Sequence, residues 1–215
     1  MIDVRPFAGL GHANHGWLNA RHHFSFANYH DPARMGWGAI RVWNDDEIGA
    51  KTGFPPHGHA DMEIITYVRS GAISHRDILG NEGRTPGGDV QVMSAGTGIT
   101  HAEFNASPNE TCHLLQIWIV PSKRGIEPGY EQKSISAEAV KNHFGRIAAP
   151  EPRANEVRLV QDAEIWVAKL DADVEAIHPL AQGRKAWLQV ASGEITLGEE
   201  TLKAGDAAAI TDLAQ

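Results

Sequence analysis

The chain has 215 residues, of which 42% are hydrophobic, and its 19 Lys and Arg against 27 Asp and Glu give a net charge of −8 at pH 7. This is the composition of an ordinary globular protein, long enough to bury a core without a disulfide or a metal ion. The acidic balance argues against a nucleic-acid or anionic-membrane surface, because both need clustered Lys and Arg. We therefore expect no membrane partner and no nucleic-acid partner.

The N-terminal sequence and the cysteine content indicate the compartment. The first residues lack the basic region and apolar stretch of a secretory signal, and the longest apolar run, near Leu114 to Val120, is too short to cross a bilayer. The one cysteine, Cys112, cannot form an intramolecular disulfide and has no basic neighbour that would activate its thiol. These features predict a cytoplasmic protein without a catalytic cysteine.

Short runs rich in Val, Ile, Trp and Tyr recur between Gly and Pro turn signals, as in an all-β protein. In chain order, the expected strands are 39–43, 63–68, 72–75, 90–93, 113–120, 164–170, 186–191, 194–197 and 207–210. The alternation over 22–26 also fits a half-buried strand, with Phe24 and Phe26 as core residues. Only 136–143 is expected to be helical, with Ser136 as its N-cap. Helices are thus few and short.

Two parts of the chain repeat one pattern of strand, Gly turn, strand and Gly-Asp turn. The front copy covers 67–73 and 86–92, and the back copy covers 188–195 and 203–209. Such repetition predicts two copies of one β unit. Between them, the segment 120–129 is rich in Pro, Gly and charged residues, as a linker is. We therefore divide the chain into domains 1–125 and 126–215.

Ten of the 12 histidines lie at or before residue 113, so the front domain is expected to carry the site. His57 and His59 are two residues apart, and on an extended strand such residues point to the same face. His101 and Glu103 repeat this spacing after the glycine-rich turn 95–98. If the two strands are neighbours inside a barrel, the four side chains converge on one divalent ion and leave positions open for water or substrate.

The residues around these pairs form a wider pattern. His57 and His59 are followed by Glu63, Gly71, Gly88, Asp89, Gly96, Gly98, His101 and Asn105. This order resembles the two sequence motifs of the cupin superfamily. The segments 11–32 and 93–103 resemble the bacterial pirin family, and the likeness extends over nearly the whole chain.

The pirin resemblance implies an all-β bicupin, in which two β-barrel (double-stranded β-helix) domains follow one another. It implies a metal-binding cupin over 1–125 and a metal-free cupin over 126–215. The sequence ends at 211–215, where similar proteins usually continue with further strands. We therefore expect the second barrel to be shortened or incomplete.

The resemblance also implies a site and an activity. The family's metal ligands fall on His57, His59, His101 and Glu103, and Glu103 is also the expected catalytic base. The usual ion is Fe(II), although Ni, Cu, Mn, Co or Zn could occupy the same ligands. Bacterial members have quercetin 2,3-dioxygenase activity, which implies a small aromatic substrate and dioxygen. Other members are regulatory, so the alternative is a metal- or redox-responsive protein that binds a protein partner.

Several other residues could compete for roles in the site. Glu63 is the main alternative to Glu103, because cupins outside the pirin group often take their acidic ligand there; the pirin resemblance favours Glu103. Asp61 is expected in a turn, and His75 and His113 as hydrogen-bonded core histidines. Structural or pocket-rim roles are expected for the remaining N-terminal histidines, His12, His15, His22, His23 and His30.

Overall fold

The computed structural model describes residues 1–105 and 107–211, and strands dominate it. None of the helices in this part of the chain is long and apolar enough to span a membrane. The strands of the front half are β1 (Ile2–Arg5), β2 (Gly11–Asn14), β3 (Leu18–His22), β4 (Ile40–Ile48), β5 (Gly53–His59), β6 (Glu63–Ser70), β7 (Ala72–Asp77), β8 (Glu82–Pro86), β9 (Val90–Ser94), β10 (Ile99–Phe104) and β11 (Cys112–Ile119). Those of the back half are β12 (Gly129–Lys133), β13 (Gly145–Ala149), β14 (Val157–Arg158), β15 (Ile165–Val167), β16 (Lys185–Gln189), β17 (Glu194–Leu197), β18 (Glu200–Lys203) and β19 (Ala207–Thr211).

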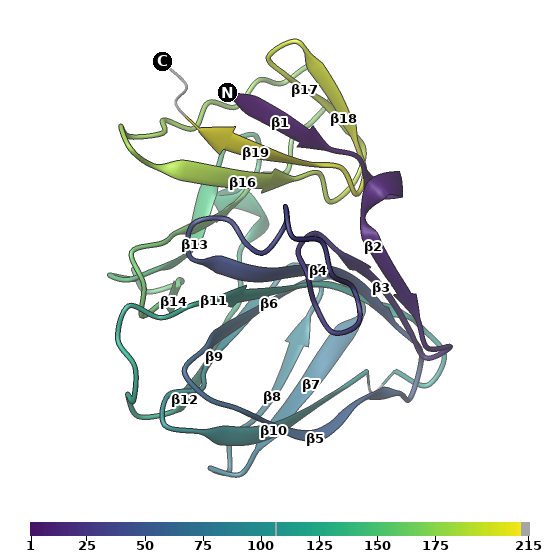
Figure 1. The fold of residues 1–215 in the computed structure, drawn as a ribbon, viewed down its shortest axis with the longest axis vertical. Helices are drawn as coiled ribbons and strands as arrows, with labels where there is room; N and C mark the ends of the chain where they lie inside the picture. The colour runs from purple at the N-terminus through teal and green to yellow at the C-terminus, as the bar shows by residue number, and fades with distance from the viewer. Residues whose placement is uncertain (106, 212–215) are drawn as a thin grey trace.

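Two sheets enclose the larger, lower part of the molecule (Figure 1). One has seven strands in the order β12-β9-β6-β11-β4-β3-β2, and the other has four in the order β5-β10-β7-β8. Apolar side chains from both sheets pack between them, including Val68 of β6, Ile73 of β7 and Leu114 of β11. The histidine pairs lie on β5 and β10, which are neighbours in the four-stranded sheet and form part of one wall of this interior.

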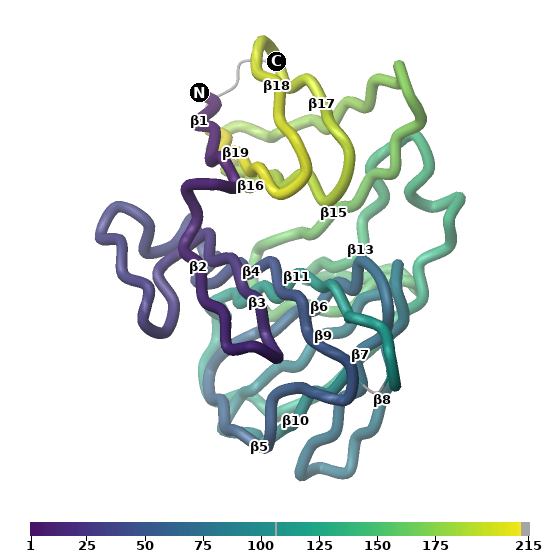
Figure 2. Tube along the Cα trace, turned by 90° about the vertical axis from the view of Figure 1, so that its right-hand side faces the viewer, coloured from purple at the N-terminus to yellow at the C-terminus, as the bar shows by residue number. Residues whose placement is uncertain are grey.

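The upper part contains the sheets β1-β19-β16 and β17-β18, with β14-β13-β15 between the two parts. The N-terminal strand β1 lies here, because Ile2 pairs with Ile210 and Arg5 with Ala207 (Figure 2). In the opposite direction, β12 joins the lower part by pairing with β9. The division at residue 125 stays a prediction. Each of the two expected domains contributes one strand to a sheet of the other: β1 pairs with β19, and β12 pairs with β9.

The outer face of the seven-stranded sheet packs on the back half of the chain. Its Ile65, Tyr67 and Ile117 share one buried cluster with Ile147 and Leu159. A polar contact borders this cluster: Gln189 donates from Nε2 to Asp45 Oδ2 (2.7 Å), and Arg69 donates to both oxygens of Asp45 (2.9 Å each). The two parts therefore share one hydrophobic core, which holds them together.

The two copies of the sequence repeat fold into the same turn. Val68 N–H donates to Asp89 O (3.1 Å), and Val190 N–H donates to Asp206 O (2.9 Å). The glycines at the first turn have matching φ angles, +77° at Gly71 and +76° at Gly193. A positive φ suits glycine because it lacks a Cβ, and this shared need explains the repeated sequence pattern.

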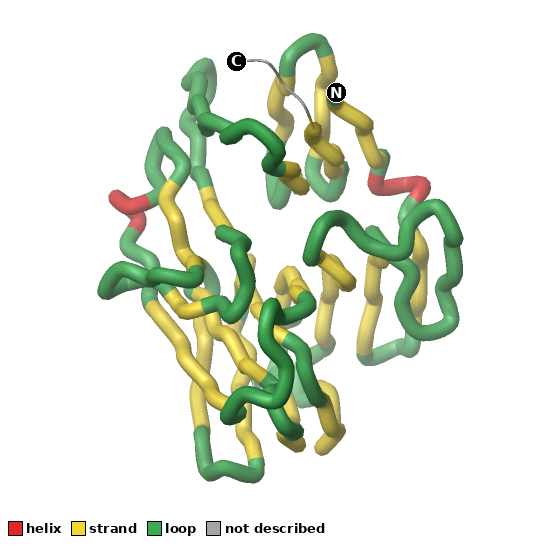
Figure 3. Tube along the Cα trace, turned by 60° about the vertical axis from the view of Figure 1, so that its left-hand side comes forward, coloured by secondary structure: helices red, strands yellow, loops and turns green. Residues whose placement is uncertain are grey.

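The helix expected over 136–143 is wrong in length. Only a 3-10 turn, Ala137–Ala139, forms there (red in Figure 3), although Ser136 does cap it by accepting from Ala139 N–H. The chain then leaves the helical path, because Asn142 has a φ of +60° and its N–H donates to Lys169 O (2.8 Å). Hydrogen bonds to a distant segment thus outweigh the local helix propensity.

The strand expected over 22–26 is also wrong, because β3 ends at His22. Ser25 uses its hydroxyl in a turn: Asp31 N–H donates to Ser25 Oγ (2.8 Å), and Ser25 Oγ donates to Asp31 O (2.9 Å). Phe24 is a core residue as expected, with 3% exposure. The other expected strands are present, and 164–170 is shortened to Ile165–Val167. The expected early end of the second barrel involves residues 212–215, which lie outside the described residues.

A buried histidine makes the stability of the fold depend on pH. His23 is fully buried, and burial, aided by the positive charges of Arg34 and His22, lowers its pKa to about 3. The unfolded chain takes up this proton near pH 6.5, so protonation of His23 has no effect on stability above that pH and increasingly favours unfolding as the pH falls from 6.5 toward 3. We expect His23→Gln to remove a slope that approaches about 1.4 kcal/mol per pH unit. Urea unfolding between pH 7 and 4 measures this, with exposed His12→Gln as the control. Parallel pH profiles for the wild type and His23→Gln would refute it.

Candidate metal centre

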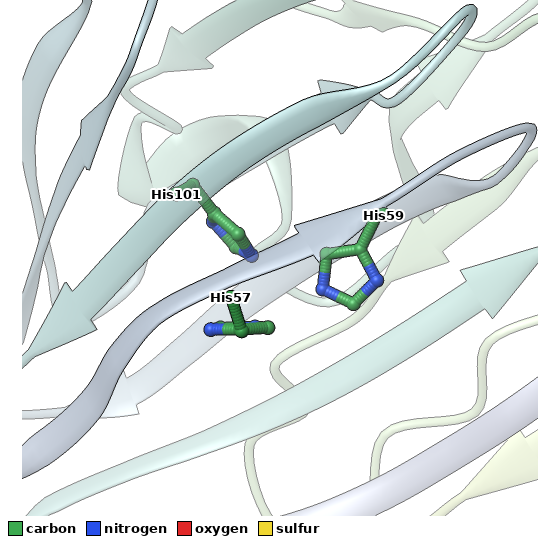
Figure 4. A group of neighbouring side chains, drawn as sticks. All are labelled: His57, His59 and His101. Atoms are coloured by element: carbon green, nitrogen blue, oxygen red, sulfur yellow. The ribbon is translucent and has the colours of Figure 1, made fainter.

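The two histidine pairs lie on neighbouring strands. In the antiparallel pairing of β10 with β5, His101 is opposite His57 and Ile99 is opposite His59. The ring centroids of His57 and His59 lie 4.8 Å apart, and the His101 centroid lies 4.5 Å from the first and 5.1 Å from the second. Each ring offers one nitrogen, and these three nitrogens all lie within 4.8 Å of one another. Figure 4 shows the three rings gathered around one space.

The ring nitrogens are arranged to leave lone pairs free. The Nδ1 of His57 lies 2.8 Å from Pro55 O, so Nδ1–H donates to this carbonyl and the lone pair of the neutral ring is on Nε2. The Nε2 of His101 is buried and has no hydrogen-bond partner among the described residues. Burial is also the main reason why the pKa falls to about 4 at His59 and about 3 at His101. Neutral imidazoles with free lone pairs are the form that binds metal ions.

Glu103 lies two residues beyond His101, after an irregularity in the pairing of β10 with β5. Its carboxylate is buried and accepts from Gln91 Nε2 (2.8 Å) and Gln116 Nε2 (3.0 Å). Burial raises the pKa of Glu103 to about 7 despite these hydrogen bonds. A carboxylate oxygen of Glu103 and ring nitrogens of His75 and His101 form a second group within 4.8 Å. Glu103 thus adjoins the His57, His59 and His101 group through His101.

His75 of β7 is a hydrogen-bonded buried histidine, as expected, and it also contacts the site. Its Nε2 lies 3.1 Å from Asp77 Oδ2, and its Nδ1 lies 3.4 Å from His101 Nδ1. One face stacks on Tyr130, with ring centroids 4.1 Å apart and planes 11° from parallel. The expectation that His113 is also a core histidine is wrong, because its side chain is half-buried and its Nδ1 lies 3.6 Å from Glu47 Oε1 at the surface of β11 and β4.

Sequence reasoning missed the residues that support the candidate ligands. Gln91 and Gln116 hold Glu103, and the hydroxyl of Tyr130 lies 3.1 Å from Gln91 Oε1. A sequence signal existed for both glutamines, because each interrupts an apolar strand, in Val-Gln-Val-Met and Leu-Leu-Gln-Ile-Trp. Buried polar side chains require partners. Their presence in such strands therefore indicated a polar interior.

The alternative acid, Glu63, lies on the other side of the sheet. It is fully buried and accepts from Ser94 Oγ (2.9 Å) and from Val160 N–H (3.1 Å). These contacts direct its carboxylate toward the back half of the chain. Asp61 has the turn role that was expected, with a φ of +49° and a side chain that accepts from Gly125 N–H (2.7 Å).

Aromatic side chains lie beside the histidine group. The ring of Trp118 meets His59 edge-on with centroids 4.9 Å apart, and Phe26 meets Trp118 in the same way at 5.3 Å. Trp118 is held in place because its Nε1–H donates to Gln116 Oε1 (3.2 Å). Both rings are only half-buried, so Phe26 borders the site instead of filling the core.

The remaining candidates have structural environments. His22 Nδ1 lies 2.9 Å from Asn44 Oδ1, and His12 Nε2 lies 2.7 Å from Asn19 Oδ1. Within the described part of the chain, the N-terminal histidines belong to neither of the groups that could hold a metal ion. Burial raises the pKa of the Cys112 thiol to about 11, which agrees with the expectation that it is not a nucleophile.

Comparison with known proteins places the chain in a family. Residues 4–119 match the pirin family, and residues 146–215 match a quercetinase C-terminal cupin domain. The chain belongs to the pirin family. The expected all-β bicupin fold is thereby confirmed.

Relatives of this pirin-family chain are similar over almost its whole length. A pirin-like protein of Caulobacter vibrioides is 50% identical and is matched over 99% of this chain and 91% of its own length. A quercetin 2,3-dioxygenase of Escherichia coli K12 is 45% identical over 99% of this chain and 90% of its own. The crystal structure of the bacterial pirin YhhW from Escherichia coli in complex with nickel(II) superposes with a TM-score of 0.93 and 44% identity, covering 99% of this chain and 91% of that one.

The positions of the two acids predict different effects of their removal. Glu103→Gln places an amide donor against Gln91 or Gln116, which both already donate there, and we expect it to weaken metal binding roughly tenfold or more and to cost about 1–3 kcal/mol of stability. Glu63→Gln loses stability through its contacts with Ser94 and Val160, and we expect its metal affinity to stay within about twofold of wild type. Calorimetric titration with Ni(II) and thermal unfolding measure both. An equal loss of metal affinity in the two variants would contradict the expectation that Glu103, and not Glu63, is the acidic ligand.

Proposed function

We propose that this chain is a metal-dependent dioxygenase that acts on a flavonol or a similar aromatic enol, in the manner of a quercetin 2,3-dioxygenase. The observation that carries the proposal is the group of His57, His59 and His101, whose ligand atoms lie within 4.8 Å of one another. The name of the Escherichia coli relative and the nickel complex of the related pirin support it.

His57, His59 and His101 are the proposed metal ligands, with Glu103 as the fourth. The residues fit a divalent ion, because the buried Nε2 of His101 is without a partner in the described residues and the His57 ring presents its Nε2 lone pair. Three neutral imidazoles and one carboxylate leave a divalent ion with about one unit of positive charge, which suits an anionic oxygen ligand. When bound, such an ion supplies Lewis-acid and redox chemistry to substrate and dioxygen.

Fe(II) is the proposed working ion. The ligand set also accepts other first-row metals, since their affinities for nitrogen and oxygen ligands follow a general order with Cu above Ni and Co, and with Fe and Mn below them. Ni, Cu, Mn, Co or Zn could therefore occupy the protein as isolated. The metal found in a preparation and the metal that supports turnover have to be determined separately.

The protein's own groups would orient the substrate and take its proton. Trp118 and Phe26 offer ring surfaces next to His59, against which a flat aromatic substrate can pack. Glu103 is the proposed base, because it is a buried carboxylate next to the ligand group and is positioned by two amide donors. A substrate hydroxyl within its reach would lose its proton to Glu103 as the enolate forms.

A metal screen with an oxygen electrode tests the activity. Metal-free protein is reconstituted anaerobically with Fe(II), Ni, Cu, Mn, Co or Zn, and oxygen uptake is then recorded with quercetin. We expect metal-dependent uptake that falls about 100-fold or more in His101→Ala and Glu103→Ala, because each change removes a ligand or the base. His12→Ala is the control, since His12 is exposed and lies outside the group. No uptake with any ion, together with metal-dependent binding of a protein partner, would instead favour the regulatory function.

The aromatic rings beside His59 predict a separable effect on substrate binding. Trp118→Ala removes a ring surface without removing a metal ligand, so we expect KM for quercetin to rise roughly three- to tenfold while the bound metal content is unchanged. Trp166→Ala is the matched control, because Trp166 packs near His178 in the back half of the chain. Steady-state oxygen uptake and metal analysis provide the two readouts. An unchanged KM would exclude Trp118 as a substrate contact.

A further inference from the structure

We propose that Asp77 and His75 fix the position of the proton on the His101 ring, so that His101 keeps a lone pair on Nε2, the buried nitrogen that has no partner among the described residues. Asp77 and His75 are positioning residues in this proposal, and neither is a metal ligand. The inference rests on the proposed metal-binding function only in the final step, because the proton position is a property of the metal-free protein.

Asp77 is held as a hydrogen-bond acceptor. Its Oδ1 accepts from the backbone N–H groups of Leu79 (2.9 Å) and Asn81 (3.1 Å), and its Oδ2 accepts from Asn81 Nδ2 (2.9 Å). The backbone groups can only donate, so they orient the carboxylate. The Nε2 of His75 lies 3.1 Å from the same Oδ2. The simplest arrangement has His75 donating from Nε2–H to this carboxylate.

The proton on His75 Nε2 determines what His75 presents to His101. A neutral imidazole carries one N–H donor and one acceptor nitrogen, so a donor at Nε2 makes Nδ1 the acceptor. That acceptor lies 3.4 Å from His101 Nδ1. His101 can complete the contact only by donating from Nδ1–H. Its Nε2 then carries the lone pair, and this is the buried nitrogen without a partner in the described structure.

Packing keeps the His75 ring in the plane that this chain of hydrogen bonds needs. Tyr130 of β12 stacks on it with centroids 4.1 Å apart, and the side chain of His75 is fully buried. The hydroxyl of Tyr130 lies 3.1 Å from Gln91 Oε1, and Gln91 Nε2 donates to Glu103 (2.8 Å). One tyrosine therefore supports His101 through His75 and Glu103 through Gln91.

His75, His101 and Glu103 could also be considered as a second metal site, since their ligand atoms lie within 4.8 Å. The hydrogen bonds argue against this. The Nδ1 atoms of His75 and His101 lie 3.4 Å apart, so one of them donates to the other and the pair does not offer two free lone pairs to an ion. An ion at this place would have to break the hydrogen bond between the two rings.

Substitutions at Asp77 and His75 distinguish an effect on the position of the His101 proton from an effect on packing alone. In Asp77→Asn, the side-chain oxygen is kept by the backbone N–H groups of residues 79 and 81, so the amide N–H₂ faces His75. His75 must then accept at Nε2 and donate from Nδ1, and His101 is forced to carry its proton on Nε2. His75→Asn keeps an acceptor oxygen near the place of Nδ1, whereas His75→Leu keeps none.

The experiment is NMR of ¹⁵N-labelled, metal-free protein together with Co(II) titration followed by visible absorption. We expect wild-type His101 to be protonated at Nδ1 and the Asp77→Asn protein to be protonated at Nε2. We expect Co(II) affinity to fall about 10- to 100-fold in Asp77→Asn and His75→Leu, and to be largely restored in His75→Asn. His113→Asn is the control, because His113 is half-buried on β11 and lies outside both ligand groups.

The outcomes distinguish this inference from others. Protonation of wild-type His101 at Nε2, or an affinity in Asp77→Asn within about twofold of wild type, would overturn it. A lower melting temperature in all three variants with the His101 proton unmoved would show a purely structural role and would also overturn it. Binding of two Co(II) ions per chain would instead indicate the second metal site. Absence of quercetin turnover leaves the NMR result unaffected, so failure of the proposed function is recognised separately.

Discussion

The structure of the site depends on one constraint, the register in which β10 pairs with β5. His101 is opposite His57 in this register, and the irregularity after His101 brings Phe54 opposite Glu103. Because side chains alternate between the faces of a strand, a slip of one residue would turn His101 and Glu103 away from His57 and His59. The apolar interior opposes such a slip, since Ile99 of β10 is itself buried against Ile64 and Met93.

A buried group of polar ligands imposes a second requirement, which the neighbouring strands meet. An unpaired polar atom in a low-dielectric interior is costly, so each proposed ligand needs an oriented partner on the side away from the place proposed for the ion. The seven-stranded sheet supplies Gln91 and Gln116 to Glu103, and the four-stranded sheet supplies His75 to His101. The site is therefore built across the barrel, with ligands on one wall and several of their partners on the facing one.

The sequence predicted those features that depend on short spacings. His57 with His59, and His101 with Glu103, could be recognised because a strand repeats every two residues, and the turn at Gly71 because a positive φ selects glycine. Tyr130 and Asp77 could not be connected to the site in this way, since their contacts depend on the stacking and pairing of distant strands. The same reason explains the failed helix, where Lys169 provides hydrogen bonds that no local pattern reveals.

The exchanged strands show how the two copies of the β unit are joined. β12 pairs with β9, which follows the turn at Asp89, and β1 pairs with β19, which follows the equivalent turn at Asp206. Both aspartates also hold the chain next to the exchanged strand: Asp89 accepts from Ile135 N–H (3.0 Å), and Asp206 accepts from Phe7 N–H (2.7 Å). The Gly-Asp repeat thus fixes a turn and docks a strand in each copy.

This arrangement gives the back half of the chain a place in the candidate metal centre. Tyr130 lies on β12, which begins after the expected boundary at residue 125, and its contacts reach His75 and Gln91 in the front barrel. The strand that carries Tyr130 is held by Asp89 at one end, while the turn at Asp89 itself belongs to the repeat that both halves share. The position of the proposed ligands in the front barrel therefore depends on a strand supplied from beyond it, and the two halves form one structural unit around the candidate site.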